Sequence, residues 1–301
     1  MRAIQTSSLV KTYKKNGQKI TALKGLNLSV EEGNIVGFLG RNGAGKSTAI
    51  KLFLGLLKPD SGEIRIFDKN PDDASVRKYI GYLPEVSYLD ADFSAFEILH
   101  FFGAFFTRDK KELKTRIDEL LNDFGLYTFK DMKLSTFSKG MLQKVAIIQA
   151  VLHCPRLLIL DEPTAGLDPI SQDEIRRFVR KEKTKGNTIF LSSHYLDEVD
   201  DLCDQIGVLH KGELLRFGDK NKLIQYRTNY EVIIKRNKAE DIIKKYGGEK
   251  YKEDEHIIPV SDREKPEFLN LLKQKGIEVI EYRRRAESMA DFFLRTIGEE
   301  R

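Results

Sequence analysis

The sequence contains no tryptophan, only two cysteines and no long apolar run. Cys154 and Cys203 lack CxxC spacing, so we expect buried free thiols in a reducing cytoplasm. The first residues, MRAIQTSSLV, lack the apolar core of a secretory signal. The most apolar window, residues 93–106, is shorter than the roughly 20 residues that a spanning helix needs. We therefore expect a chain that does not cross a membrane by itself.

The sequence also lacks a strong excess of positive or negative residues. Charged residues make up 32% of the chain, the net charge is +5, and both signs are interspersed. The densest basic cluster, residues 283–285, is expected to be a solvated strand end. No nucleic-acid partner is therefore expected.

Apolar patterning divides the chain into two parts. Residues 1–224 begin with period-two strands and continue with buried apolar runs that alternate with helices, which is typical of an α/β domain with a mainly parallel sheet. Residues from about 94 to 152 form an inserted helical subdomain in this interpretation. Residues 225–301 alternate as β-α-β-α-β-α and predict a small α+β domain, which could serve as a dimer brace or as a regulatory site.

Residues 40–48, GRNGAGKST, fit the phosphate-binding pattern GxxxxGK[ST]. A short apolar run precedes this loop and a helical pattern follows it, so backbone N–H groups at a helix N-terminus face the phosphates. Lys46 is expected to reach the β- and γ-phosphate oxygens, and the Ser47 hydroxyl to bind Mg²⁺. The nucleotide-binding candidates are Gly40, Arg41, Asn42, Gly43, Ala44, Gly45, Lys46, Ser47 and Thr48.

Two further apolar runs end in polar residues. Asp161 and Glu162 end LLILDE (157–162) at the carboxyl edge of a predicted strand, where parallel sheets bind ligands. Asp161 is expected to hold the metal, and Glu162 to orient or deprotonate the attacking water. An N-cap role is the alternative for this acid pair. His194 ends TIFLSSH (188–194) and is expected to contact the γ-phosphate, with a structural histidine as the alternative.

Residues 137–141, FSKGM, precede an apolar helix. The Ser138 hydroxyl and the Gly140 N–H stand at this helix N-terminus and form a second anion site. Because Ser138 follows the helical insertion, we expect it to lie away from the P-loop of its own chain. Two such sites that cannot share one phosphate indicate a two-fold dimer, in which each P-loop meets Ser138 of the partner subunit.

Taken together, the motifs in residues 1 to about 222 resemble an ABC-transporter ATP-binding subunit. GRNGAGKST is similar to Walker A, LLILDE to Walker B, AGLD (165–168) to the D-loop and SSH to the switch histidine, while FSKGM stands in place of the signature LSGGQ. The resemblance implies a P-loop NTPase cassette with a mainly parallel sheet, an N-terminal antiparallel β part and a helical subdomain. It also implies ATP hydrolysis with Mg²⁺ in an ATP-sandwich homo- or heterodimer.

The resemblance assigns roles to the signature and the D-loop. Ser138, Lys139, Gly140 and Met141 would contact ATP bound to the partner subunit, with the Lys139 side chain pointing away from the nucleotide. Asp168 would belong to the D-loop. ATP would close two subunits head to tail, and hydrolysis would reopen them.

The sequence departs from the family pattern at three positions. Lys139 replaces a glycine and Met141 replaces a glutamine of the signature. Glu85 in YLPE (82–85) stands at the Q-loop glutamine, where its carboxylate can ligate Mg²⁺ or hold the water. Tyr13 stands where the family has an aromatic residue that stacks on adenine, and a core tyrosine is the alternative.

SKGM and YLPE resemble the exporter-type subfamily, which handles drugs, bacteriocins, lipids or sodium. We therefore expect ATP-driven transport, as export, through a separate permease that holds the chain on the cytoplasmic face of the membrane. The permease would dock at residues 93–106 beside Glu85, and core packing of these phenylalanines is the alternative. A rival function is a soluble ABC ATPase acting on ribosomes or DNA. Such proteins carry two cassettes or long coiled coils, which this sequence lacks.

Overall fold

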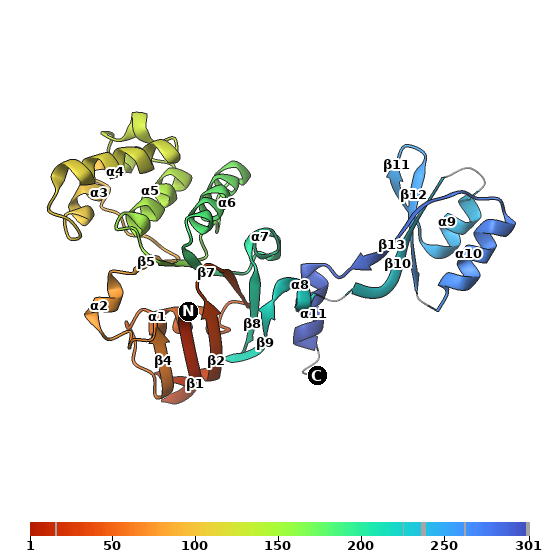
Figure 1. The fold of residues 1–301 in the computed structure, drawn as a ribbon, viewed down its shortest axis with the longest axis horizontal. Coiled ribbons are helices and arrows are strands. Elements are labelled where there is room, and N and C mark those ends of the chain that lie inside the picture. The colour runs from red at the N-terminus through yellow and green to blue at the C-terminus, as the bar shows by residue number, and fades with distance from the viewer. Residues whose placement is uncertain (16, 225, 236–238, 262, 299–301) are drawn as a thin grey trace. The chain divides into compact units, whose positions relative to one another are not determined.

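The computed structural model contains two compact units, both drawn in Figure 1. It describes residues 1–15, 17–224, 226–235, 239–261 and 263–298. The first unit comprises Met1–Lys220 and the chain from Thr296 onward, and the second comprises Asn221–Arg295. No helix in the described ranges combines the length and the apolar character that crossing a bilayer requires.

Strands of the first unit form two sheets. They are β1 (Arg2–Lys15), β2 (Gln18–Glu31), β3 (Ile35–Leu39), β4 (Ser61–Ile66), β5 (Ile80–Leu83), β6 (Leu157–Asp161), β7 (Thr188–Ser193), β8 (Gln205–His210) and β9 (Glu213–Asp219). An antiparallel sheet has the order β2-β1-β4, and a six-stranded sheet has the order β5-β6-β7-β3-β8-β9. Only β9 runs antiparallel to its neighbour in the larger sheet. The predicted α/β class with a mainly parallel sheet and an N-terminal antiparallel part is confirmed.

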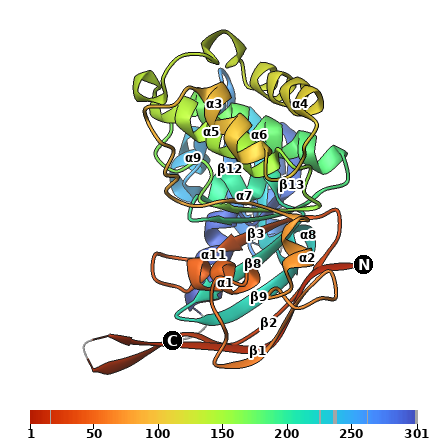
Figure 2. The ribbon, with the colours of Figure 1, turned by 90° about the vertical axis from the view of Figure 1, so that its left-hand side faces the viewer.

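The helices of the first unit pack against its sheets or against one another. In the first unit they are α1 (Lys46–Phe53), α2 (Ala74–Arg77), α3 (Ala95–Gly103), α4 (Lys110–Asp123), α5 (Lys139–Val151), α6 (Pro169–Thr184) and α7 (Leu196–Leu202). The 3₁₀ turns η1 (Tyr127–Phe129) and η2 (Leu134–Thr136) join α4 to α5. Figures 1 and 2 both show α3, α4 and α5 gathered at the end of this unit opposite the β1-β2-β4 sheet. Ser94 begins α3 with a capping box to Glu97, a sequence-encoded helix start.

An aromatic cluster fixes α1 against the parallel sheet. The ring of Phe190 on β7 lies 5.3 Å from Phe38 on β3 and 5.4 Å from Phe53 on α1, and all three are buried. Burying a side chain of this size stabilises a fold by about 1.5–3 kcal/mol. The loop at residues 40–45 is therefore held at both ends, by β3 and by α1.

The second unit has a β-α-β-β-α-β order, as in ferredoxin-like folds. Its elements are β10 (Tyr226–Lys235), α9 (Glu240–Tyr246), β11 (Glu249–Lys252), β12 (Glu255–Ser261), α10 (Lys265–Gln274) and β13 (Val279–Ala286). The helices α8 (Lys220–Leu223) and α11 (Met289–Gly298) flank this series in the chain. The antiparallel sheet has the order β11-β12-β10-β13. The expected β-α-β-α-β-α alternation is wrong at β11, whose four residues are all exposed and give no apolar signal.

Candidate active site

The loop between β3 and α1 carries the phosphate-binding pattern. Gly45 caps α1 at φ 114°, a conformation that glycine adopts without steric cost. An added Cβ at Gly45 would lie 2.5 Å from the Ala22 carbonyl oxygen, and one at Gly40 would lie 2.6 Å from the Leu209 carbonyl oxygen. The close approach of other backbone therefore requires both glycines. The N–H groups of the first turn of α1 face this loop as a potential anion site.

Lys46 lies buried in the first turn of α1, and its ammonium has two partners. Nζ donates to the Gly40 carbonyl oxygen at 2.6 Å and lies 3.2 Å from Oε1 of Glu162. Lys46 and Glu162 are each 6% exposed. Removing one member of a buried ion pair leaves an uncompensated charge, which is strongly destabilising. Each side chain therefore holds the other in this conformation.

The other carboxylate oxygen of Glu162 faces His194. Oε2 lies 2.7 Å from His194 Nδ1 and accepts the His194 backbone N–H at 3.3 Å. Glu162 has φ 53°, a left-handed conformation that costs a non-glycine residue about 1–3 kcal/mol. Its own N–H donates to the Ser192 carbonyl oxygen at 3.1 Å. Glu162 is therefore a buried carboxylate in a strained conformation, held between a lysine and a histidine at the P-loop.

Asp161 ends β6 beside the end of β7. The parallel register pairs it with Ser192, whose hydroxyl donates to Asp161 Oδ1 at 2.5 Å. Burial, followed by the negative charges of Asp161 and Glu85, raises the pKa of Tyr82 to about 12. Tyr82, which the sequence motifs did not indicate, thus stays a neutral phenol between the two acids.

The oxygen donors at this edge fit a magnesium ion. Asp161 offers a buried carboxylate, and Ser47 offers a hydroxyl in the first turn of α1. Mg²⁺ prefers such hard oxygen ligands and usually binds one or two carboxylates together with phosphate oxygens. Among the residues that the structure describes, no cluster of three or more His, Cys, Asp or Glu could hold a metal. Ser47 and Asp161 could therefore hold Mg²⁺ together with phosphate oxygens.

Ala44 is buried in the core, whereas other P-loop candidates lie nearer the surface. Arg41, Asn42 and Gly43 are exposed at the tip of the loop. The Tyr13 hydroxyl lies 3.4 Å from Thr48 Oγ1, and Tyr13 is 37% exposed. Tyr13 is thus a surface residue beside α1 rather than part of the core.

The signature stretch and the D-loop lie against each other. Ser138 caps α5 by accepting the Met141 N–H at 3.3 Å. An added Cβ at Gly140 would lie 2.5 Å from Ser171 Oγ on α6. Hydrogen bonds from the Ser171 hydroxyl and N–H, at 2.6 and 3.0 Å, hold the pKa of the Asp168 carboxyl below its usual value. Across the described ranges, no hydrogen bond or ion pair joins Ser138 to the P-loop of its own chain.

Glu85 lies beside the signature stretch. It lines a cavity of about 390 Å³ together with Lys139 on α5 and Ala165 and Gly166 of the D-loop. The structure brings Lys46, Asp161, Glu162 and His194 together at one edge of the parallel sheet, and the charges of Glu85 and Asp161 both act on Tyr82.

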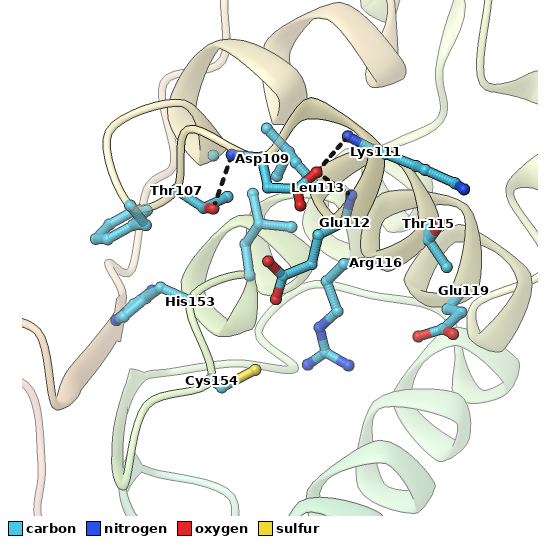
Figure 3. A pocket seen from close by; sticks show the side chains of 13 residues that line it. Thr107, Asp109, Lys111, Glu112, Leu113, Thr115, Arg116, Glu119, His153 and Cys154 are labelled. Atoms are coloured by element: carbon cyan, nitrogen blue, oxygen red, sulfur yellow. Dashed lines mark hydrogen bonds between the residues drawn. The ribbon is translucent and has the colours of Figure 1, made fainter.

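A larger cavity lies in the helical region, at the end of α5 opposite Ser138. Figure 3 shows this cavity of about 730 Å³, lined by the end of α3, the start of α4 and the residues after α5. His153 stacks on Phe106 with ring centroids 4.3 Å apart, and its Nε2 lies 3.0 Å from the Ile80 carbonyl oxygen. These contacts join the helical insertion to β5. No P-loop residue lines this cavity.

Glu198 is a site residue that the sequence motifs did not indicate. It is fully buried on α7, accepts the Thr164 hydroxyl at 2.9 Å and accepts the Ser193 hydroxyl at 2.6 Å. Thr164 follows Glu162 by two residues, and Ser193 immediately precedes His194. Glu198 therefore fixes the two segments that carry the acid and the histidine. In the sequence alone, the only indication of this role is that Glu198 follows His194 by four residues.

Comparison with known proteins places this geometry in a family. Residues 23–165 match the family described as ABC transporter. The bacitracin transport ATP-binding protein BcrA of Bacillus licheniformis is 37% identical, over 98% of this chain and 97% of BcrA. The Nod factor export ATP-binding protein I of Rhizobium sp. (strain N33) is 32% identical, over 99% of this chain and 98% of that protein.

Solved structures extend the comparison to the fold. An ATP-binding cassette described as a dimeric post-hydrolysis state with ADP and phosphate is 28% identical, with a TM-score of 0.66. The match covers 72% of this chain and 98% of that cassette. The cassette fold that the sequence predicted is thereby confirmed.

The buried carboxyl of Glu198 gives a pH-dependent prediction. Burial raises its pKa above the ordinary 4.5, while the Ser193 and Thr164 hydrogen bonds act in the opposite direction. The folded state thus binds a proton that the unfolded state has released, so this group's contribution to stability falls as pH rises above 4.5. Glu198→Gln should remove that fall. Urea unfolding from about pH 5 to about pH 8 measures it.

The control is Glu63→Gln, which removes one charge from an exposed carboxyl. The free energy of unfolding of Glu198→Gln should rise relative to the parent as pH increases, whereas that of Glu63→Gln should not. A constant difference between Glu198→Gln and the parent over this range would contradict the assignment of a raised pKa.

Proposed function

This chain belongs to the ABC transporter family of ATP-binding subunits, and from that premise we propose that it hydrolyses ATP to power export through a separate membrane permease. The observation that carries the proposal is Glu162, held at the P-loop between Lys46 at 3.2 Å and His194 at 2.7 Å. The names of BcrA and of the Nod factor protein associate full-length relatives with transport and export. The chain would lie on the cytoplasmic face of the membrane through its permease.

The side chains divide the chemical work among them. P-loop N–H groups and Lys46 bind the phosphates. The Lys46 ammonium then leaves its ion pair with Glu162 and pairs with phosphate oxygens instead. Glu162 is then free to take a proton from the attacking water, and His194 keeps its carboxylate oriented. Ser47 and Asp161 would hold Mg²⁺, which neutralises phosphate charge when bound.

Tyr13 and Glu85 are the other residues that we assign to the nucleotide site. The ring of Tyr13, beside Thr48, is accessible for stacking on adenine. The charges of Glu85 and Asp161 both act on Tyr82, so we assign Glu85 to holding water or metal.

Two chains, identical or related, would enclose the nucleotides. Ser138 and Gly140 present a hydroxyl and a helix N-terminus that their own P-loop does not use, and they would contact ATP at the P-loop of the partner subunit. Asp168 would lie at the same interface. The dimeric state in the name of the similar cassette supports this arrangement.

The surface around α3 is the proposed permease contact. Ala95, Ile98 and Leu99 face the core, whereas Phe101 is 54% and Phe105 is 74% exposed. The segment at residues 93–106 therefore has one packed face and one exposed aromatic face. Exposed aromatic residues of this kind are typical anchors in protein interfaces.

Glu162→Gln tests the assignment of the base. Without a carboxylate to accept the proton, ATP turnover should fall by at least about 100-fold. ATP should still bind, so an ATP-bound dimer should accumulate, as measured by sedimentation velocity alongside phosphate release.

Glu213→Gln, at an exposed ion pair with Lys24, is the matched control and should hydrolyse ATP like the parent. Parental turnover by Glu162→Gln would refute the role of Glu162.

A double variant, Phe101→Ser with Phe105→Ser, tests the permease surface. Loss of two exposed anchors should weaken permease binding by about 30-fold or more. ATP turnover by the isolated chain should stay within about twofold, because exposed substitutions usually perturb a fold little. Co-purification with the permease and phosphate release measure the two effects.

Tyr251→Ser, an exposed aromatic residue in the second unit, is the matched control and should leave permease binding intact. Parental permease binding by the double variant would place the interface elsewhere.

A further inference from the structure

Lys139, which stands at a signature position where the family has glycine, contacts the D-loop of its own chain. Its Nζ donates to the Ala165 carbonyl oxygen at 3.2 Å. Gly166, with φ 67°, lies directly beneath the ammonium, and an added Cβ there would collide with Nζ. The charge is thus turned toward the D-loop carbonyl. A glycine at position 139 could not make this contact.

The contact continues to the catalytic segment through one further hydrogen bond. The Ala165 N–H donates to the Glu162 carbonyl oxygen at 3.2 Å, closing the turn that follows β6. This turn holds Glu162 at its strained φ of 53°. Lys139 Nζ and the backbone of the proposed base are therefore linked through a single residue, Ala165. Strained backbone persists only where surrounding contacts determine it.

A second side chain of α5 supports the same turn. Gln143 Nε2 donates to the Pro163 carbonyl oxygen at 2.9 Å. Lys139 and Gln143 lie four residues apart, on one face of the helix. The start of α5 therefore holds two carbonyl groups of the segment that follows Glu162.

We propose that Lys139 is a positioning residue that couples the two ATP sites of the dimer. In the proposed dimer, Ser138 contacts ATP at the P-loop of the partner subunit, while Glu162 acts on ATP bound to its own chain. The Lys139–Ala165 contact joins these two groups. Closure of the signature on the partner's ATP therefore sets the position of the chain's own base. This inference rests on the proposed dimeric ATPase.

The test compares four full-length variants with the parent: Lys139→Ala, Lys139→Arg, Gly166→Ala and the double variant Lys139→Ala with Gly166→Ala. Phosphate release is measured against ATP concentration to give the turnover number and the Hill coefficient. For Lys139→Ala, we expect turnover to fall by about three- to tenfold. Its Hill coefficient should fall from about 2 toward 1, because the sites no longer communicate. Lys139→Arg keeps the donor and should restore both values.

Gly166→Ala separates the contact with the D-loop from any direct contact of Lys139 with nucleotide. Its Cβ displaces Nζ from Ala165, so it should reproduce the loss of cooperativity with Lys139 still present. The added methyl group at positive φ can also act independently of Lys139. Comparing the double variant with Lys139→Ala measures that independent effect. If both substitutions break one contact, the Hill coefficient of the double variant should be no lower than that of Lys139→Ala.

Three results would overturn the proposal. The first is a parental Hill coefficient in Lys139→Ala, and the second is a Hill coefficient in Lys139→Arg as low as that of Lys139→Ala. The third is a double variant whose losses of turnover and cooperativity equal the sum of the losses in the two single variants. Failure of the proposed function is separate and visible in the parent. A parent chain that neither hydrolyses ATP nor dimerises with it would refute the ATPase itself.

Discussion

The buried contact between Lys46 and Glu162 is the interaction on which the rest of the site depends. The lysine comes from the P-loop, and the glutamate from the strained turn after β6. A phosphate that draws Lys46 away must leave Glu162 with His194 as its remaining partner. Because an unpaired charge in this position is costly, nucleotide binding and the release of Glu162 would be energetically one event in the proposed mechanism. The proposed base would therefore stay paired with Lys46 until phosphate arrives.

The parallel sheet makes this contact possible. Strands β6, β7 and β3 are neighbours, so the polar groups that follow each strand meet at one edge. The register of β6 and β7 places Ser192 opposite Asp161 and His194 within reach of Glu162. The aromatic core beneath α1 then fixes Lys46 relative to that edge. Glu198 completes the arrangement from α7, because it accepts hydroxyl groups from both segments.

The sequence predicted the parts of the site that follow local rules. Glycine spacing before a helix indicated the P-loop, and apolar runs that end in polar residues indicated Asp161 and His194. The direction of a long side chain such as Lys139 depends on tertiary neighbours, so neither periodicity nor spacing could predict its contact with Ala165. Glu198 was missed for a similar reason, since a carboxylate on a short polar helix resembles a solvated one. Strand β11 was missed because none of its residues is buried.

The coupling of Lys46 to Glu162 is tested most directly by calorimetric titration of the parent and Glu162→Gln with ADP. ADP lacks the γ-phosphate that would draw in the signature of a second subunit, so the titration reports the P-loop of one chain. If Glu162 competes with phosphate for Lys46, its neutral replacement should tighten ADP binding by about three- to tenfold. Equal or weaker binding by Glu162→Gln would show that the lysine is not held by the base, and would contradict the account.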